Sequence, residues 1–177
     1  DTVFISPSQS QGIGRKGRNF LSNEGGCYFS IVEMREKNVL RTISRMLVSV
    51  IEVLQEYGYC SKIKWPNDVL IKDKKICGIM CDVVKDRIIL GVGLNLYNDI
   101  SKISDIATSM FIEGDCKATR AELITRIVKR YFDMKKRDFS YVANQYQIHL
   151  NIMGKVVSIN QNSKIFFSLV LVFELVS

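Results

Sequence analysis

The alternation of apolar and polar residues along the chain predicts a series of short β-strands. The apolar runs are rich in β-branched and aromatic residues, and prolines or turn-forming residues separate them. Pro7 ends the first run, and Pro66 ends a later one because proline has no N–H to donate to a strand ladder. The predicted strands are residues 2–5, 26–33, 61–65, 69–71, 75–84 and 87–95.

Three other segments carry apolar residues at the three/four spacing of a helix face. Asn38 is placed to cap the first helix, and Gly58 to end it. Thr119 opens the second with a capping box, and the third spans residues 139–149. Residues 107–111 are predicted to be a buried crossing between elements. The apolar face of the first helix comprises Leu40, Ile43, Met46, Leu47, Val50, Ile51 and Leu54.

The last part of the chain predicts a separate, small β segment. Residues 155–159 and 165–176 have strand character, and a polar turn joins them. The final run is almost wholly apolar, so without partner strands it would be prone to aggregate. We therefore divide the chain into a main domain, residues 1–150, and a C-terminal β segment, residues 151–177.

Composition indicates a soluble globular protein. With 177 residues and 47% hydrophobic content, the chain can bury a proper core. No apolar run is long enough for a membrane span, and the first residues do not resemble a signal peptide. The five cysteines include no C-x-x-C pair, which argues against structural zinc or a disulfide framework and favours the reducing cytoplasm. A single histidine, His149, makes a histidine-dependent hydrolase a poor fit.

A glycine-rich basic loop is the first candidate for chemistry. Residues 8–18 contain three glycines and three basic side chains but only one large apolar residue, Ile13, so we expect a mobile loop that cannot bury itself. Glycines let backbone N–H groups approach an anion, and arginines supply fixed positive charge. The loop is either a cradle for phosphate or carboxylate, or a flexible basic linker. It is not a Walker loop.

The second candidate is the stretch K-W-P-N-D-V-L-I-K-D-K-K-I-C-G, residues 64–78. It places Lys64 and Lys75 near Asn67 and Asp68 on one small sheet, which suits an anionic ligand and a metal ion. An ordinary hairpin with solvated lysines is the alternative. Further along, the sequence G-V-G-L-N, residues 91–95, leaves one strand face bare enough for a flat ligand group.

The glycine-rich basic loop, a strand, a long helix, K-W-P-N-D, the following lysine and glycine, and G-V-G-L-N occur in this order along the chain. As an ordered set they resemble the catalytic domain of biotin protein ligases, also called biotin–acetyl-CoA-carboxylase ligases. The match runs from about Gln9 to Tyr146, and K-W-P-N-D followed by K-x-x-G is its most specific part. The resemblance implies an α+β fold, with a mixed, largely antiparallel sheet backed by helices, as in class II aminoacyl-tRNA synthetases and biotin ligases. A small, incomplete C-terminal β appendage would follow it.

The resemblance also implies a two-step reaction. Biotin and ATP, with Mg²⁺, would give biotinyl-5′-AMP, and the biotinyl group would pass to one lysine of a biotin carboxyl carrier protein. A homodimer is compatible with this family. No DNA partner is expected, because the chain shows no helix-turn-helix.

The resemblance assigns roles to residues that match the family's motifs. The predicted catalytic residues are Lys75, Arg15 and Asp68, and Asp68 is also the tentative Mg²⁺ ligand. The predicted biotin-binding residues are Gln9, Gly12, Gly14, Arg15, Lys75 and Gly78. The predicted ATP-binding residues are Arg15, Arg18, Lys64, Asn67, Lys75 and Asn95.

Three departures from the family pattern affect these expectations. Ile13 stands where the family has its first loop arginine, so charge contributes less to loop closure. The upstream Ser/Thr-Asn element that binds the biotin ureido ring is absent, and the C-terminal segment is shorter than the usual barrel.

Two other functions compete with the ligase. A lipoate or octanoate ligase or transferase shares the fold, but Gly25-Gly26-Cys27 lacks the arginine pair of its motif, and we interpret Cys77 as a packing residue. A basic nucleic-acid-binding domain would fit the net charge of +7 and would predict salt-sensitive retention of DNA or RNA.

Overall fold

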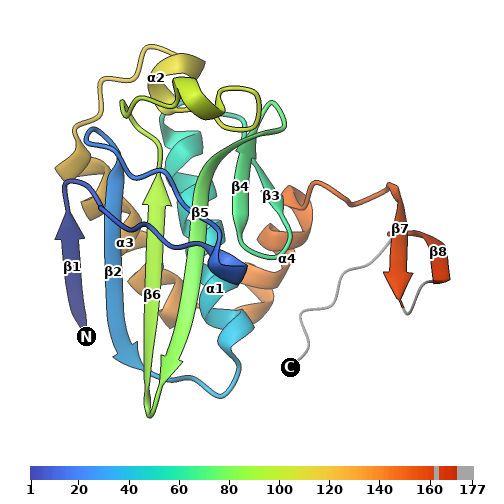
Figure 1. The fold of residues 1–177 in the computed structure, drawn as a ribbon. Helices are drawn as coiled ribbons and strands as arrows, with labels where there is room; N and C mark the ends of the chain where they lie inside the picture. Colours follow the sequence, from blue (N-terminus) through green and yellow to red (C-terminus); the bar gives the residue numbers. More distant parts are fainter. Residues whose placement is uncertain (162–163, 171–177) are drawn as a thin grey trace.

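The computed structural model describes residues 1–161 and 164–170 (Figure 1). Its main sheet has six strands in the order β1-β2-β6-β5-β4-β3, and each strand is antiparallel to its neighbours. The strands are β1 (Thr2–Ser6), β2 (Cys27–Met34), β3 (Lys62–Lys64), β4 (Asp68–Ile71), β5 (Lys74–Val84) and β6 (Arg87–Leu94). A separate two-stranded sheet pairs β7 (Val156–Gln161) with β8 (Lys164–Leu169).

Among the described residues, helices cover one face of the main sheet and a loop crosses the other face (Figure 1). The long helices behind the sheet are α1 (Val39–Glu56), α3 (Arg120–Lys136) and α4 (Phe139–His149). The short helix α2 (Met110–Glu113) lies at one end of the sheet, and the 3-10 turn η2 (Ser101–Ile103) precedes it in the chain. The loop between β1 and β2, which contains the 3-10 turn η1 (Arg15–Gly17), crosses the open face.

The predicted caps and turns explain where these elements begin and end. The Asn38 side chain accepts a hydrogen bond from the backbone N–H of Leu40, and Thr119 caps α3 in the same way through Glu122. Lys72 and Asp73 both have positive φ, at 47° and 64°, as a two-residue hairpin turn requires. The predicted α+β fold with helices on a largely antiparallel sheet is confirmed.

The core lies between α1 and the sheet. Six of the seven predicted apolar positions of α1 are buried or half-buried, but Leu40, in the first turn, is 41% exposed. The inward side chains of the sheet alternate with outward ones, as along β6, where Ile88 and Leu90 are fully buried. Burying one such side chain contributes about 1.5–3 kcal/mol.

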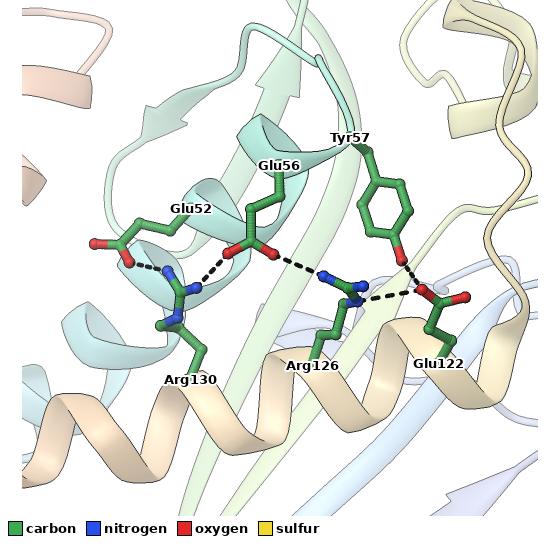
Figure 2. Close-up of polar contacts among 6 residues, drawn as sticks. All are labelled: Glu52, Glu56, Tyr57, Glu122, Arg126 and Arg130. Carbon is green, nitrogen blue, oxygen red and sulfur yellow. Dashed lines mark hydrogen bonds and ion pairs between the residues drawn. The ribbon is translucent and has the colours of Figure 1, made fainter.

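Ion pairs join α1 to α3 on the helical side (Figure 2). Arg130 forms ion pairs with Glu52 and Glu56. Arg126 forms ion pairs with Glu56 and Glu122, both at 3.2 Å. The Tyr57 hydroxyl donates to Glu122 at 2.8 Å, which continues the row beyond the last turn of α1. This network lies on the side of the sheet away from the loop, so it stabilises the helical layer without touching the open face.

Some sequence predictions need correction or lie outside what can be compared. Residues 107–111 are not wholly buried, because Phe111 is 65% exposed where α2 begins. Residues 160, 161 and 164, predicted to lie in a turn, belong to β7 and β8, and residues 162–163 lie outside the described residues. The predicted last strand reaches Leu169 in β8, and residues 171–176 lie outside the described residues. The domain boundary near residue 150 stays a prediction. No described helix combines the length and apolar composition that crossing a membrane requires.

Candidate active site

Lys75 lies at the start of β5 and points to the open face of the sheet. Its Nζ is 2.7 Å from Asp68 Oδ1 on β4 and 5.4 Å from the centre of the Phe20 ring. The side chains of Lys75 and Asp68 are 32% and 23% exposed. Lys75 lines the cavity on this face, whereas Asp68 does not, and the Oδ1 atom that pairs with Lys75 is buried. The sequence predicts that Lys75 lies near Asn67 and Asp68, and the structure shows Lys75 in an ion pair with Asp68 at the surface of the sheet.

A bulge in β5 turns Lys75 and Gly78 to the same face. Residues three apart in a regular strand lie on opposite faces, because side chains alternate. Here Val69 pairs with Cys77 while Leu70 pairs with Lys75, which leaves one extra residue, Ile76, on β5. Ile76 and Cys77 both turn into the core at 0% exposure, and Lys75 and Gly78 both line a cavity on the open face.

A buried polar network fixes the backbone of Lys75. Its N–H donates to the carbonyl of Ile106, and its carbonyl accepts from the N–H of Thr108, each at 2.9 Å. The Asn95 amide donates to the Thr108 carbonyl at 2.9 Å and accepts from the Asn98 amide at 3.0 Å. These three polar residues are at most 4% exposed, so their hydrogen bonds are shielded from water and hold Lys75 in place.

The predicted ATP residue Asn95 is thus part of this support and lies outside the cavity lining. Its contact with ATP stays a prediction. Sequence reasoning missed Asn98 and Thr108, because neither belongs to a motif that predicts chemistry.

Glycines form the floor of the cavity. Ser6, Tyr28, Gly93 and Gly78 pair in one row across β1, β2, β6 and β5. The Phe20 ring lies over this floor: a Cβ on Gly93 would come within 2.5 Å of the ring, and one on Gly78 within 3.2 Å. A Cβ on Gly78 would also lie 2.9 Å from Lys75 Nζ. The Phe20 ring therefore covers the strand face that G-V-G predicts to be open to a flat ligand group, and the contact of this face with a ligand stays a prediction. The aromatic cover is not apparent from the sequence.

The β1–β2 loop folds back on itself as a hairpin-like flap. Backbone N–H groups of Gln9, Phe20 and Gly14 donate to carbonyls of Ser22, Gly12 and Arg18 at 3.0, 2.8 and 2.7 Å. These bonds satisfy backbone groups that an unstructured loop would leave to water. The prediction that the loop cannot bury itself was therefore incomplete, because backbone pairing replaces the missing apolar contacts. Its mobility without ligand stays a prediction.

Arg15 connects this flap to the K-W-P-N-D corner. Its Nη1 donates to Asn67 Oδ1 at 3.3 Å, and the Asn67 amide donates to the Ile79 carbonyl at 2.7 Å. The Trp65–Pro66 peptide bond just before Asn67 is cis. Arg15 and Asn67 both line the cavity, as does Gly14. Arg18 and Lys64 are exposed and do not line it, so their contacts with phosphate stay predictions.

The cavity between flap and sheet has a volume of about 90 Å³. Two cationic side chains, two side-chain amides, glycines and apolar side chains line it. These residues are Gln9, Ile13, Gly14, Arg15, Phe20, Asn67, Lys75, Gly78, Ile79, Met80, Gly91, Val92 and Gly93. Ligand pockets usually measure about 300–1,000 Å³. The flap or the Phe20 ring must therefore move before a ligand of that class can enter.

A second, larger hollow of about 500 Å³ lies on the other side of the same flap residues. It shares Gln9, Ile13, Met80 and Gly91 with the first cavity and adds hydroxyl groups and the Asp82 carboxylate. The two cavities therefore adjoin one another at these shared residues.

Cysteine and metal chemistry find little support among the described residues. Cys77 is fully buried beneath the cavity floor, and burial raises the pKa of its thiol, so it is no poised nucleophile. Burial also lowers the pKa of His149, whose Nε2 lies 3.4 Å from Gln55 Nε2 at the end of α4. No group of three or more His, Cys, Asp or Glu residues within the described ranges could hold a metal ion. Asp68 offers a single carboxylate, which suits Mg²⁺ only where substrate phosphates supply other ligands.

The model of the biotin/lipoate A/B protein ligase family matches residues 1–96, more than half of the 177-residue chain. The chain therefore belongs to this family. The bifunctional ligase/repressor BirA of Bacillus subtilis is 32% identical over 157 residues, a match that covers 78% of this chain and 48% of BirA. The biotin–acetyl-CoA-carboxylase ligase of Mycobacterium tuberculosis is 28% identical over 136 residues, covering 72% of this chain and 51% of that protein.

The biotin protein ligase of Aquifex aeolicus in complex with biotin and ATP has a similar structure, with a TM-score of 0.81 at 26% identity. That similarity covers 94% of this chain and 85% of the Aquifex chain. By contrast, the chain spans about half the length of the two sequence relatives. Family membership favours the ligase over the nucleic-acid-binding alternative.

Proposed function

We propose that this chain activates biotin with ATP and transfers the biotinyl group to a lysine of a biotin carboxyl carrier protein. The observation that carries the proposal is the position of Lys75. Its ammonium stands at the edge of a glycine-floored cavity, paired with Asp68 and opposite the Arg15 flap. Biotin–acetyl-CoA-carboxylase ligase is the name of one relative, and a complex with biotin and ATP has been solved for a structural neighbour.

In the first step, a biotin carboxylate oxygen attacks the α-phosphorus of ATP. The bond from that phosphorus to the β-phosphate oxygen breaks, and pyrophosphate leaves. Two anions must approach one another, so the reaction needs fixed positive charge where negative charge gathers. We assign to Lys75 the contact with both the carboxylate and the α-phosphate, and Arg15, which lines the same cavity, would add a second cation from the flap.

Mg²⁺, when bound with the triphosphate, would neutralise part of the phosphate charge. Asp68 would be its protein ligand, with Asn67 beside it. The ion pair between Asp68 and Lys75 competes with that role, because one carboxylate oxygen already lies 2.7 Å from the ammonium.

In the second step, the amine of the acceptor lysine attacks the acyl carbon, and AMP leaves. The amine must first lose a proton, since a lysine has a pKa of about 10.4 in water. We assign to Asp68, which is ion-paired with the cavity-lining Lys75, the role of orienting that lysine or accepting its proton. No nucleophile from the protein is needed, which agrees with the burial of Cys77.

The direct test is transfer of labelled biotin to a purified carrier domain, with and without ATP. Labelling that requires ATP supports the proposal. Labelled lipoate and octanoate in parallel reactions test the other acyl groups of the family, and preferential transfer of either one would overturn the assignment to biotin. The reducing cytoplasm is the compartment we propose for this reaction, in keeping with the free cysteines of the described chain.

A further inference from the structure

Ser22 is a buried polar residue at the base of the flap. It follows the glycine-rich loop in sequence and is 4% exposed. Its hydroxyl has one proton, which it donates in a three-centre hydrogen bond to Gln9 Oε1 and to the carbonyl oxygen of Phe20, each 3.0 Å from Oγ. Its backbone carbonyl also accepts a hydrogen bond from the N–H of Gln9 at 3.0 Å. Side chain and backbone of Ser22 thus hold the same glutamine.

Gly12 provides the space for this contact. A Cβ at position 12 would lie 2.5 Å from Ser22 Oγ, 2.4 Å from the Phe20 carbonyl oxygen and 3.0 Å from Gln9 Oε1. The first two distances are shorter than real Cβ contacts, and one of them involves backbone, which cannot easily move. Three polar atoms therefore converge over the α-carbon of Gly12, and any side chain there would separate Ser22 from Gln9.

Gly12, predicted to bind biotin, does not line the cavity, and its contact with biotin stays a prediction. Its backbone carbonyl is used in the flap, where it accepts from the N–H of Phe20 at 2.8 Å. The glycine contributes to the site by allowing the contact between Ser22 and Gln9.

Gln9 itself is exposed and lines both cavities, so it borders the space where a ligand would lie. A free glutamine samples several rotamers and loses that freedom on binding. With Oε1 facing Ser22, the opposite end of the amide, Nε2, is the end available to a ligand as a donor.

We propose that Ser22 is a positioning residue that fixes the amide of Gln9 for a hydrogen bond to biotin. The inference rests on the proposed function, because it names a determinant of ligand affinity in the same site. Ser22 itself touches no ligand and acts through Gln9.

A double-mutant cycle tests this role on the whole chain. Biotin dissociation constants are measured by calorimetry for the wild type, Ser22→Ala, Gln9→Ala and the double variant. Loss of the preset rotamer should weaken binding about tenfold in Ser22→Ala. Gln9→Ala should lose at least as much. Adding Ser22→Ala to Gln9→Ala should then change nothing further, because the residue through which Ser22 acts is gone.

Matched controls separate positioning from folding. Ser49 is also a buried serine, whose hydroxyl donates to the Arg45 carbonyl at 2.6 Å on the helical side. Ser49→Ala should leave biotin affinity unchanged. Gln9→Glu keeps an oxygen toward Ser22 but removes the donor from the cavity, so it should bind as weakly as Gln9→Ala. If Ser22→Ala fails to fold, Ser22→Cys keeps the size with a weaker donor and should show a smaller loss in the same cycle.

The outcomes distinguish the two levels of the proposal. A wild type that binds no biotin overturns both the proposed function and this inference. A wild type that binds biotin, with Ser22→Ala binding equally well, overturns the inference alone. An equal loss from Ser22→Ala with and without Gln9 would show that Ser22 supports the flap in general, and would also overturn it.

Discussion

Two adjacent lysines at the start of β5 allow a matched test of the proposed chemistry. Lys75 Nζ lies on the open face, 2.7 Å from Asp68. Lys74 is its neighbour in sequence, but its Nζ donates to the carbonyl of Ser104 at 2.6 Å, away from the cavity lining. Lys75→Ala and Lys74→Ala remove the same charge and the same methylene groups from one strand. Only the first should affect the reaction of biotin with ATP.

The expected loss follows from the charge that Lys75 supplies. Two unit charges 4 Å apart interact with about 4 kcal/mol at an effective dielectric constant of about 20. The Lys75 side chain is 32% exposed, so solvent screens part of this, and we take about 2–3 kcal/mol. Since each 1.36 kcal/mol is a factor of ten in rate, adenylate formation should fall about 30- to 160-fold. Asp68, left without its cation, would repel the substrates and add to the loss.

The assay is biotin-dependent exchange of labelled pyrophosphate into ATP. Thermal unfolding of both variants checks that each still folds. We expect both to fold, because alanine retains the backbone hydrogen bonds that Lys75 makes. A Lys75→Ala rate within threefold of wild type would remove this ammonium from the mechanism. An equal fall in Lys74→Ala would show that net charge at the strand end, and not contact with the reacting groups, is responsible.

Three further predictions test other parts of the structure. Gly93→Ala should press a methyl group against the Phe20 ring, and because such overpacking costs about 1–3 kcal/mol, biotin binding measured by calorimetry should weaken by about 5- to 150-fold. Gly91→Ala, whose Cβ would meet nothing nearer than 3.8 Å, should leave the ring in place and bind biotin more tightly than Gly93→Ala does. Arg130→Ala should lower the free energy of unfolding by about 1–3 kcal/mol in urea titrations without changing biotin affinity, and an unchanged stability would contradict the ion-pair network. Cys77 should resist iodoacetamide in the native chain while exposed Cys60 reacts, and rapid labelling of Cys77, followed by mass spectrometry, would contradict the bulge.

Local signals in the sequence were sufficient for the elements of the main sheet and its helices. Asn38 and Thr119 cap helices because their side chains accept the first free N–H groups, an effect that depends only on neighbouring residues. The Lys72-Asp73 turn follows from hairpin geometry in the same way. Such local signals do not predict the exposure of Leu40. It has the right spacing for the buried face, but its burial depends on what lies opposite, which periodicity does not contain.

The candidate site was predicted in part, and the missing part is long-range. Lys75, Gly78, Arg15 and Asn67 lie together as their motifs predict. Phe20 carries no motif, although it covers the glycine floor, because its position depends on how the flap folds back over β5 and β6. Asn95 is the opposite case, because it belongs to a motif but does not line the cavity. Its motif suggested a ligand contact, but its buried amide bonds to Asn98, three residues along the chain, and to Thr108, whose position depends on how a later segment packs.

The bulge in β5 shows most clearly how a motif and a fold depend on one another. The K-x-x-G spacing alone would place Lys75 and Gly78 on opposite faces of a regular strand, where one of them would point into the helical core. The extra residue, Ile76, shifts the alternation by one, so both face the flap while Ile76 and Cys77 fill the core together. The N–H of Asn95 donates to the Ile76 carbonyl at 2.9 Å, so the same network that holds Lys75 also supports the bulge. The spacing of the motif is therefore the signature of a bulged strand, and it can serve a ligand on the open face only because β4 and the end of β6 hold that irregular geometry.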